Sequence, residues 1–347
     1  MNKSILAIIA LVLIVGVGFF IFPAKDKNKT NAQPISAQEL QDALNRQLAM
    51  LFPQDDELRI DGSFACNEKK EKLVCKAQKI AVIDTMSDTE LASLQNLTLD
   101  YLITHENYDS TISGDVSYGQ ALLEQIEFFN RGFIEALTPL LPNKFSCNTG
   151  GTLDSVQGIE TNWGECTIVS PSADWIISGN MDIGFDLFKN ATMPELILED
   201  GKLGNLGELT EDNIDSVQIG LRQATLTLVS RNFSDALFEV IRLKEPNLTR
   251  GELALGVDMA IGMAIMAMRA NEIDEEDMRT SEQFAQALEH LQAGLRGLLA
   301  SDSDVTNISV SLQAKEPQKI MLYSPAMLEM GSVFEFLRHY NLESSYK

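Results

Sequence analysis

The chain has four cysteines, and their spacing points more directly to chemistry than any other feature. They fall into two local pairs, Cys66 with Cys75 and Cys147 with Cys166. A zinc site would need C-x₂-C spacing or nearby histidines, and neither pair provides them. A disulfide within each pair is the expected arrangement, although four cysteines allow three connectivities. Such bridges are typical of an oxidising compartment, so we expect the body of the protein to lie outside the cytoplasm.

Motifs for catalysis are missing from the sequence. It holds no G-x-S-x-G elbow, no P-loop, no G-x-G-x-x-G opening a helix after a strand and no H-E-x-x-H. His105 lies near Asp100, Asp109 and Ser110, but this is a composition rather than a triad. Acidic runs such as 274–277 lack the D-x-D-x-D-G pattern of a calcium loop. We therefore expect no metal, no cofactor and no enzymatic activity, with a hydrolase built on scattered carboxylates as the remaining enzymatic alternative.

The segment 253–268, LALGVDMAIGMAIMAM, is apolar on nearly every side and carries one charged residue, Asp258. A helix of this kind is usually buried in a core. Its methionines also suit an adaptable surface that repacks around a partner or a lipid. If the helix lines an apolar groove, contact with the ligand or partner falls on Met259, Met263 and Met266. Its short length and its aspartate argue against a second membrane span.

The N-terminal run 5–22 is uncharged and, at about 1.5 Å per residue, spans about 27 Å, which is enough for a bilayer core. It is longer than a usual signal-peptide core and no A-x-A-type cleavage site follows it, so we favour an uncleaved anchor over a cleaved signal peptide. Residues 1–4 then form a cytoplasmic tip and 23–35 a polar tether. Asn28, in a D-x-N-x-T pattern on this tether, is a candidate bacterial N-glycosylation site. With the expected disulfides, these features predict a single-pass inner-membrane protein with a periplasmic body.

The charge balance excludes some partners. Lys and Arg total 27 against 50 Asp and Glu, for a net charge of −23. Nucleic acid is excluded because its affinity for proteins depends on neutralising phosphates with Lys and Arg. Docking on an anionic lipid surface is disfavoured for the same reason. Because several lysines flank the anchor, the body is more acidic than the whole chain, and the tether is expected to hold it clear of the bilayer.

Helix and strand patterns recur along the chain. A capping-box pattern at Ser36 opens a helix that ends before Pro53, and a hairpin carrying the first cysteine pair follows it. Residues 120–141 form a second amphipathic pattern, and Phe145-Ser-Cys147-Asn148 then echoes Phe64-Ala-Cys66-Asn67. An I-S-G triplet also occurs twice, at Ile112 and Ile177. We interpret 36–118 and 119–230 as two related helix-plus-hairpin units, with chance similarity as the alternative.

The last third, 231–347, is rich in helix patterns. Ser234 opens one predicted helix, a capping box at Thr249 opens another, and a long one covers 274–300. A strand at 305–312 and a final helix at 326–340 complete the chain. Strands joined mostly by hairpins, with helices between them, predict an α+β fold built on an antiparallel sheet.

Residues 38–80 resemble the start of the JlpA-type surface lipoproteins of campylobacters. The resemblance rests on the leading amphipathic helix, the F-x-C-N motif at Phe64–Asn67, a short polar turn and the second cysteine, Cys75. The segment 95–119 has that family's cadence as well. The resemblance implies a strongly curved, unclosed antiparallel half-barrel and a role in adhesion at the cell surface. This chain departs from the family because it has a transmembrane anchor and no lipid-acceptor cysteine.

We therefore expect a non-enzymatic, membrane-anchored periplasmic module that binds a protein partner or a lipid-like ligand. A surface-exposed adhesin is the first alternative and a carboxylate-based hydrolase is the second. A curved sheet could cradle an acyl chain or a partner strand.

Overall fold

The structure is a computed structural model that describes most of the body of the chain. The predicted anchor 5–22 and the glycosylation candidate Asn28 lie outside the described residues, as does most of the predicted helix 326–340. The described residues are 35–50, 58–70, 72–129, 132–185, 188–198, 218–270, 275–300, 305–316 and 337–347.

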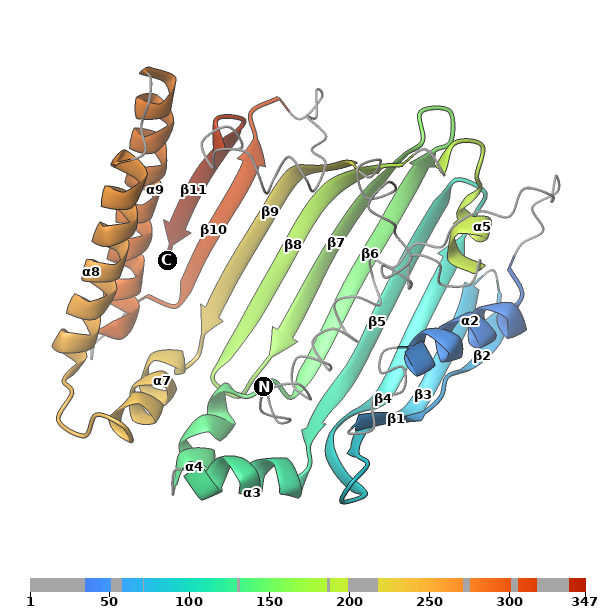
Figure 1. Cartoon of the computed structure of the whole chain (residues 1–347), viewed down its shortest axis with the longest axis horizontal. Coiled ribbons are helices and arrows are strands. Elements are labelled where there is room, and N and C mark those ends of the chain that lie inside the picture. The colour runs from blue at the N-terminus through green and yellow to red at the C-terminus, as the bar shows by residue number, and fades with distance from the viewer. Residues whose placement is uncertain are drawn as a thin grey trace. The chain divides into compact units, whose positions relative to one another are not determined.

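In these residues, eleven strands form one antiparallel sheet that is not closed (Figure 1). They are β1 (Leu58–Gly62), β2 (Ala65–Lys69), β3 (Lys72–Asp84), β4 (Thr89–Ile103), β5 (Asn107–Tyr118), β6 (Lys144–Asp154), β7 (Ile159–Val169), β8 (Ala173–Gly184), β9 (Gln218–Ser230), β10 (Asn307–Ala314) and β11 (Tyr340–Tyr346). The order is β1-β3-β4-β5-β6-β7-β8-β9-β10-β11, and β2 also pairs with β3. Most neighbours in the sheet are consecutive in the chain, as antiparallel hairpins allow. The predicted α+β class with an antiparallel sheet is confirmed.

The chain divides into two compact units, each made of interleaved segments. Strands β7, β8 and β9 contribute residues to both. The predicted units 36–118 and 119–230 are continuous stretches of sequence and do not coincide with these interleaved units. The proposed duplication therefore stays a prediction. Unit 1 comprises 1–131, 143–164 and 182–219, and unit 2 comprises 132–142, 165–181 and 220–347.

In unit 1, helix α2 (Ala37–Met50) lies against β2 and β3 (Figure 1). The predicted capping box is present, because the Glu39 carboxylate accepts hydrogen bonds from the Ser36 backbone N–H (2.9 Å) and hydroxyl (2.7 Å). The apolar face of the helix is buried, with Leu40 at its centre. The first part of β3, residues 72–77, alternates buried side chains with more exposed ones, so one face of the hairpin joins the core, whereas residues 80–84 are all buried.

The pattern at 120–141, predicted as one helix, forms three shorter pieces: α3 (Gln120–Phe129), α4 (Phe133–Leu137) and the 3₁₀ helix η1 (Thr138–Leu140). Gly132 precedes α4 with φ of 80°, a left-handed conformation that glycine adopts readily and most other residues avoid. The expectation of a continuous helix was therefore wrong. The apolar spacing of the sequence continues past Gly132, but the backbone leaves the helical conformation at this residue.

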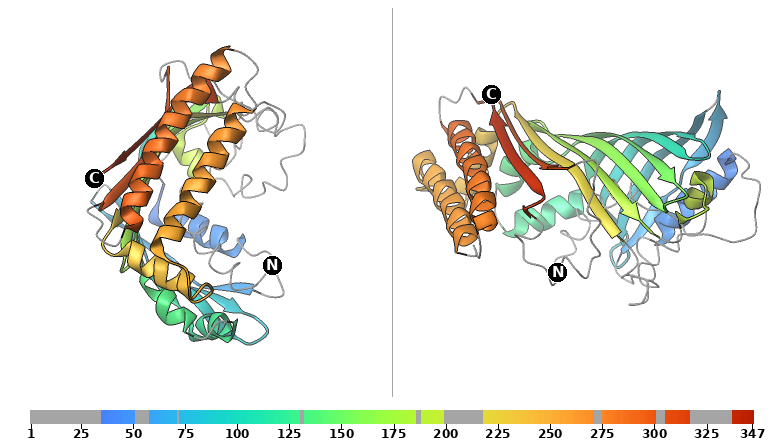
Figure 2. Two further views of the ribbon diagram at one scale, coloured as in Figure 1. Left: turned by 90° about the vertical axis from the view of Figure 1, so that its left-hand side faces the viewer. Right: turned by 90° about the horizontal axis from the view of Figure 1, so that it is seen from above.

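Unit 2 contains α7 (Phe233–Arg242), α8 (Arg250–Arg269) and α9 (Glu275–Leu299). Helix α9 matches the predicted long helix and packs on β10 and β11. Helices α8 and α9 lie side by side (Figure 2). The predicted helix 326–340 ends at Tyr340, but in the structure this residue begins strand β11, which pairs with β10 along seven positions.

Both predicted disulfides are accounted for. Cys66 on β2 lies directly opposite Cys75 on β3 and is bonded to it. The remaining two cysteines, Cys147 on β6 and Cys166 on β7, are also disulfide-bonded, and none of the four, all of which lie in described residues, is free. The first hairpin is therefore clipped across its two strands, as predicted.

Candidate functional site

The outward face of α8 carries four of the large apolar side chains that are exposed among the described residues. Leu255, Met259, Met263 and Met266 follow one another at spacings of three or four residues, which places them on one side of the helix. Each is more than half exposed. Within this fully described helix only Ile265 is buried. The expectation that 253–268 forms a buried core helix was therefore wrong.

Polar contacts hold the inward face of α8 to its neighbours. The Asp258 carboxylate accepts a hydrogen bond from Gln292 Nε2 at 2.8 Å and forms an ion pair with Arg296, both on α9. The hydrogen bond from Arg296 makes the largest contribution to lowering the pKa of Asp258, and the bond from Gln292 lowers it further. At the start of the helix, the Thr249 hydroxyl accepts a hydrogen bond from the Glu252 backbone N–H, completing the predicted capping box.

Arg250 ties the same end of α8 to α7. Its guanidinium donates to the Ser234 hydroxyl at 2.9 Å, forms an ion pair with Asp235 and lies 4.7 Å from the centre of the Phe238 ring. Arg250 and Asp258 are thus engaged on the side of the helix that faces α7 and α9. The methionines are left on the opposite side.

Two glycines of α8 are not required by packing against any of the described residues. A Cβ atom added at Gly256 or Gly262 would meet no heavy atom within 4 Å. In α9, by contrast, a Cβ at Gly297 would lie 2.7 Å from Val305 Cγ2, so that glycine makes room for a neighbour. A glycine inside a helix costs about 0.5–1 kcal/mol relative to alanine. The glycines of α8 therefore face open space at an energetic cost.

Among the residues that the structure describes, α8 is also the one helix long and apolar enough to cross a membrane by length and composition. Buried core helices and signal sequences pass the same test, so this alone does not place the helix in a bilayer. Its charged Asp258, fixed by contacts to α9, remains on the inward face.

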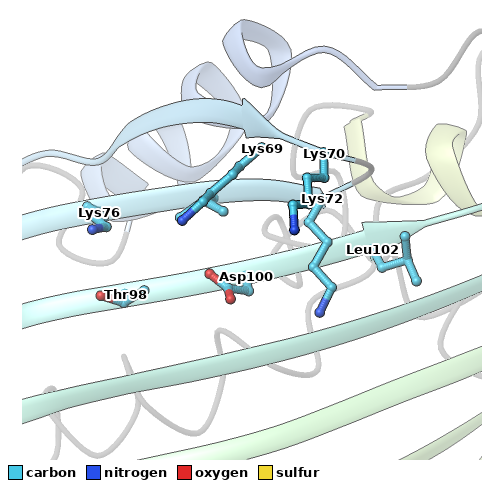
Figure 3. Close-up of a pocket in the computed structure, with 8 residues that line it drawn as sticks. Lys69, Lys70, Lys72, Lys76, Thr98, Asp100 and Leu102 are labelled. Atoms are coloured by element: carbon cyan, nitrogen blue, oxygen red, sulfur yellow. The ribbon is translucent and has the colours of Figure 1, made fainter.

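A second surface feature is a hollow of about 760 Å³ over β2, β3 and β4, where lysines gather (Figure 3). The register places Val74 opposite Asp100 and Lys76 opposite Thr98, so these outward residues of β3 and β4 share one face. Lysine ammonium groups attract carboxylates and phosphates as point charges. From the sequence this stretch was predicted only as a hairpin with a short polar turn. The lining residues are Lys69, Lys70, Lys72, Val74, Lys76, Thr98, Asp100 and Leu102.

A buried acid lies in unit 1. Glu160 on β7 is fully buried, and neither of its carboxylate oxygens has a hydrogen-bond partner among the described residues. Burial raises the pKa of Glu160 to about 8, and the nearby Asn162 side chain lowers it by a smaller amount. The Tyr108 hydroxyl donates to Asn162 Oδ1 at 3.0 Å. Glycine is required at Gly151, where a Cβ would lie 2.6 Å from that same oxygen.

The groups considered for hydrolysis do not come together. His105 is exposed in the loop between β4 and β5, whereas Ser110 is buried and its hydroxyl shares a 2.7 Å hydrogen bond with Thr149. Glu160 is enclosed, so a substrate would not reach its carboxyl group in this conformation. The described residues contain no group of three or more His, Cys, Asp or Glu side chains placed to hold a metal ion.

Comparison of the chain with protein-family models and with curated proteins finds no match. The resemblance of residues 38–80 to JlpA-type lipoproteins is therefore still a prediction from sequence. The candidate site rests on geometry, and the exposed face of α8 is its strongest feature, followed by the lysine hollow.

Proposed function

We propose that this protein is a non-enzymatic binding module that docks a protein partner through the outward face of α8. In this proposal residues 5–22 anchor it in the inner membrane, with the N-terminus in the cytoplasm and the body in the periplasm. The observation that carries the proposal is the exposure of four large apolar side chains along one helix face. Contiguous apolar surface of this kind is typical of interaction sites, since covering it releases ordered water.

The composition of this face supports a protein partner. Methionine side chains are flexible and polarisable, and they adapt to a partner's surface without a fixed shape of their own. Between Glu252 and Arg269 the one charged residue of α8 is Asp258, which is paired with Arg296 on the inward side, so a partner approaching the face would not have to desolvate an unpaired charge there. On a chain with net charge −23, such an uncharged stripe is a favourable docking position.

A lipid-like ligand is the competing occupant of the same face. An acidic body is repelled by anionic headgroups, which disfavours direct contact with such a bilayer. Native mass spectrometry of the full-length protein released from mild detergent would separate the two. Bound lipid that is lost from a Met263→Gln variant would favour the lipid occupant.

The finer features of the fold belong to the same proposal. An open antiparallel sheet is the architecture from which a curved half-barrel of the JlpA type would be built, and two related helix-plus-hairpin units would account for the repeated F-x-C-N motif. Adhesion at the cell surface is the alternative function that the resemblance to JlpA-type lipoproteins implies. Protease treatment of whole cells that leaves the body intact would eliminate a surface adhesin.

Site-specific photo-crosslinking in native membranes tests the docking proposal. A photoreactive amino acid at Met263 should form an adduct with a discrete protein. The same group at Val156, which is 87% exposed at a hairpin tip in unit 1, is the matched control and should form none. Equal adducts at both positions, or no protein adduct at Met263, would contradict the proposal.

A further inference from the structure

We infer that the partner of the α8 face is α8 of a second copy of this chain, packed antiparallel about a two-fold axis that crosses the exposed stripe at the level of residue 261. The inference rests on the proposed function and names the partner of the same site. It follows from the order of large and small residues along the exposed stripe, from the unfilled glycines and from the charge of the chain.

The exposed stripe is complementary to itself when it is reversed. In an antiparallel pair, residues equally far from the two-fold axis on either side lie opposite each other. With the axis at the level of residue 261, midway between Met259 and Met263, Met259 lies opposite Met263 of the other copy, and Gly256 lies opposite Met266. All of these positions belong to the arc of α8 that contacts neither α7 nor α9 through the bonds described above.

The open space at Gly256 then has an occupant. Apart from the nearby backbone of α8 itself, no heavy atom of the described residues lies within 4 Å of a Cβ placed there, and Met266 is among the most exposed methionines of the helix. A methionine from the second copy would fill this gap and allow the two backbones to approach closely. Small residues at a helix contact serve this purpose, and Ala260 and Ala264 lie on the same arc.

A two-fold interface also needs a patch that tolerates a copy of itself. Each chain carries a net charge of −23, so most of the surface repels a second copy. Between Glu252 and Arg269 the only charged residue of α8 is Asp258, which is paired with Arg296. The stripe is therefore a place where two copies can meet without opposing unpaired charges.

The small contact area determines the strength of the dimer, and the acidic charge of the two bodies determines its salt dependence. One helix pair buries less than the roughly 800 Å² per partner of a standard interface, so we expect a concentration-dependent dimer. Confinement of both copies to a membrane would raise their effective concentration. Repulsion between the acidic bodies is screened by salt, so added NaCl should strengthen the dimer. A complex with a basic partner would instead weaken.

Light scattering on the full-length protein in neutral detergent measures the mass of the polypeptide directly. We expect it to double with rising protein concentration, and to do so at lower concentration as NaCl rises from about 0.05 M to about 0.5 M. Gly256→Met should abolish the doubling while leaving a folded monomer with a raised melting temperature, because the substituted side chain meets nothing in its own chain. A dimer that survives this substitution would overturn the inference.

Cysteine crosslinking tests the orientation, since all four native cysteines are bonded and an introduced one is the only free thiol. A mixture of Met259→Cys and Met263→Cys proteins, treated with a short bis-maleimide, should give more dimer than either variant alone. More dimer in the single variants would indicate parallel packing and overturn the inference. Val156→Cys is the control. A protein that stays monomeric while its Met263 photo-adduct contains a different protein would refute the second copy and leave the proposed function standing.

Discussion

The side-chain amide of Asn45 forms hydrogen bonds with both backbone groups of Phe64. Its Nδ2 donates to the Phe64 carbonyl at 3.1 Å, and its Oδ1 accepts from the Phe64 N–H at 2.7 Å. The helix side chain thus takes the place of a strand partner at the start of the F-x-C-N motif. One turn earlier in the helix, Gln41 Oε1 accepts from the Cys66 N–H at 2.9 Å. Two amides of α2 therefore fix the edge strand whose cysteine clips the hairpin.

We predict that Asn45→Leu destabilises unit 1 by about 2–3 kcal/mol, because it leaves two partly buried backbone groups without partners. Urea unfolding of the full-length protein, followed by circular dichroism, measures the change. Gln38→Ala is the control, since Gln38 is exposed and its side chain donates a hydrogen bond to Asp42 within the same helix. A loss no larger than in the control would show that water replaces the amide at Phe64.

The helices that were predicted correctly are those whose signals are local. The capping boxes at Ser36 and Thr249 and the periodicity of 274–300 depend on residues within a few turns of one another, and each feature is present. The exposure of α8 was not predictable in this way, because burial depends on which distant element covers a face. An all-apolar helix that nothing covers has the same sequence pattern as one in a core.

The candidate surfaces depend on pairings that are distant in sequence. Strand pairing brings Asp100 beside the lysines of the hairpin, which the spacing of these residues does not reveal. The I-S-G echo also loses its meaning in three dimensions. Ile112 lies on the fourth strand counted from the first F-x-C-N motif and Ile177 on the third strand from the second, so the two triplets do not occupy equivalent positions. Alternation at 340–346 was the available signal for β11.

Glu160 should make stability depend on pH. Its pKa in the folded protein is about 8, above the ordinary 4.5, so the folded state keeps a proton that the unfolded chain releases. The stabilisation is complete below the unfolded pKa and is lost as pH rises towards 8. Glu160→Gln has no titrating group at this position. The free energy of unfolding of the variant, relative to that of the wild type, should therefore rise by on the order of a few kcal/mol between pH 5 and pH 8.

Melting temperatures of the two proteins across this range measure the effect. Glu135→Gln, at an exposed position on α4, is the control and should follow the wild type at every pH. A constant difference between Glu160→Gln and wild type at pH 5 and pH 8 would mean that the buried acid does not titrate between them.

The Cys66–Cys75 disulfide should stabilise the protein by restricting the conformations of the unfolded chain. Cys66 and Cys75 have a sequence separation of 9, and closing a loop of that size stabilises the folded state by about 2.5 kcal/mol in the chain-entropy model. Replacing both by alanine should lower the free energy of unfolding by about that amount.

Mass spectrometry after alkylation checks the bonding state. No thiol should react without reductant, and alkylation of all four cysteines under those conditions would contradict the structure.

Two glycine-to-alanine substitutions in neighbouring helices should have opposite effects. Gly256→Ala places a methyl group where no heavy atom lies within 4 Å, so it should stabilise α8 by about 0.5–1 kcal/mol. Gly297→Ala gains the same helix propensity but places its Cβ 2.7 Å from Val305 Cγ2, and the resulting shift in packing should make the change destabilising by about 1 kcal/mol or more. Thermal unfolding at a low protein concentration compares the two variants without a contribution from association. If Gly256→Ala lowered the melting temperature as Gly297→Ala is expected to, the space beside α8 would be filled within the monomer, and the face could not be a docking surface.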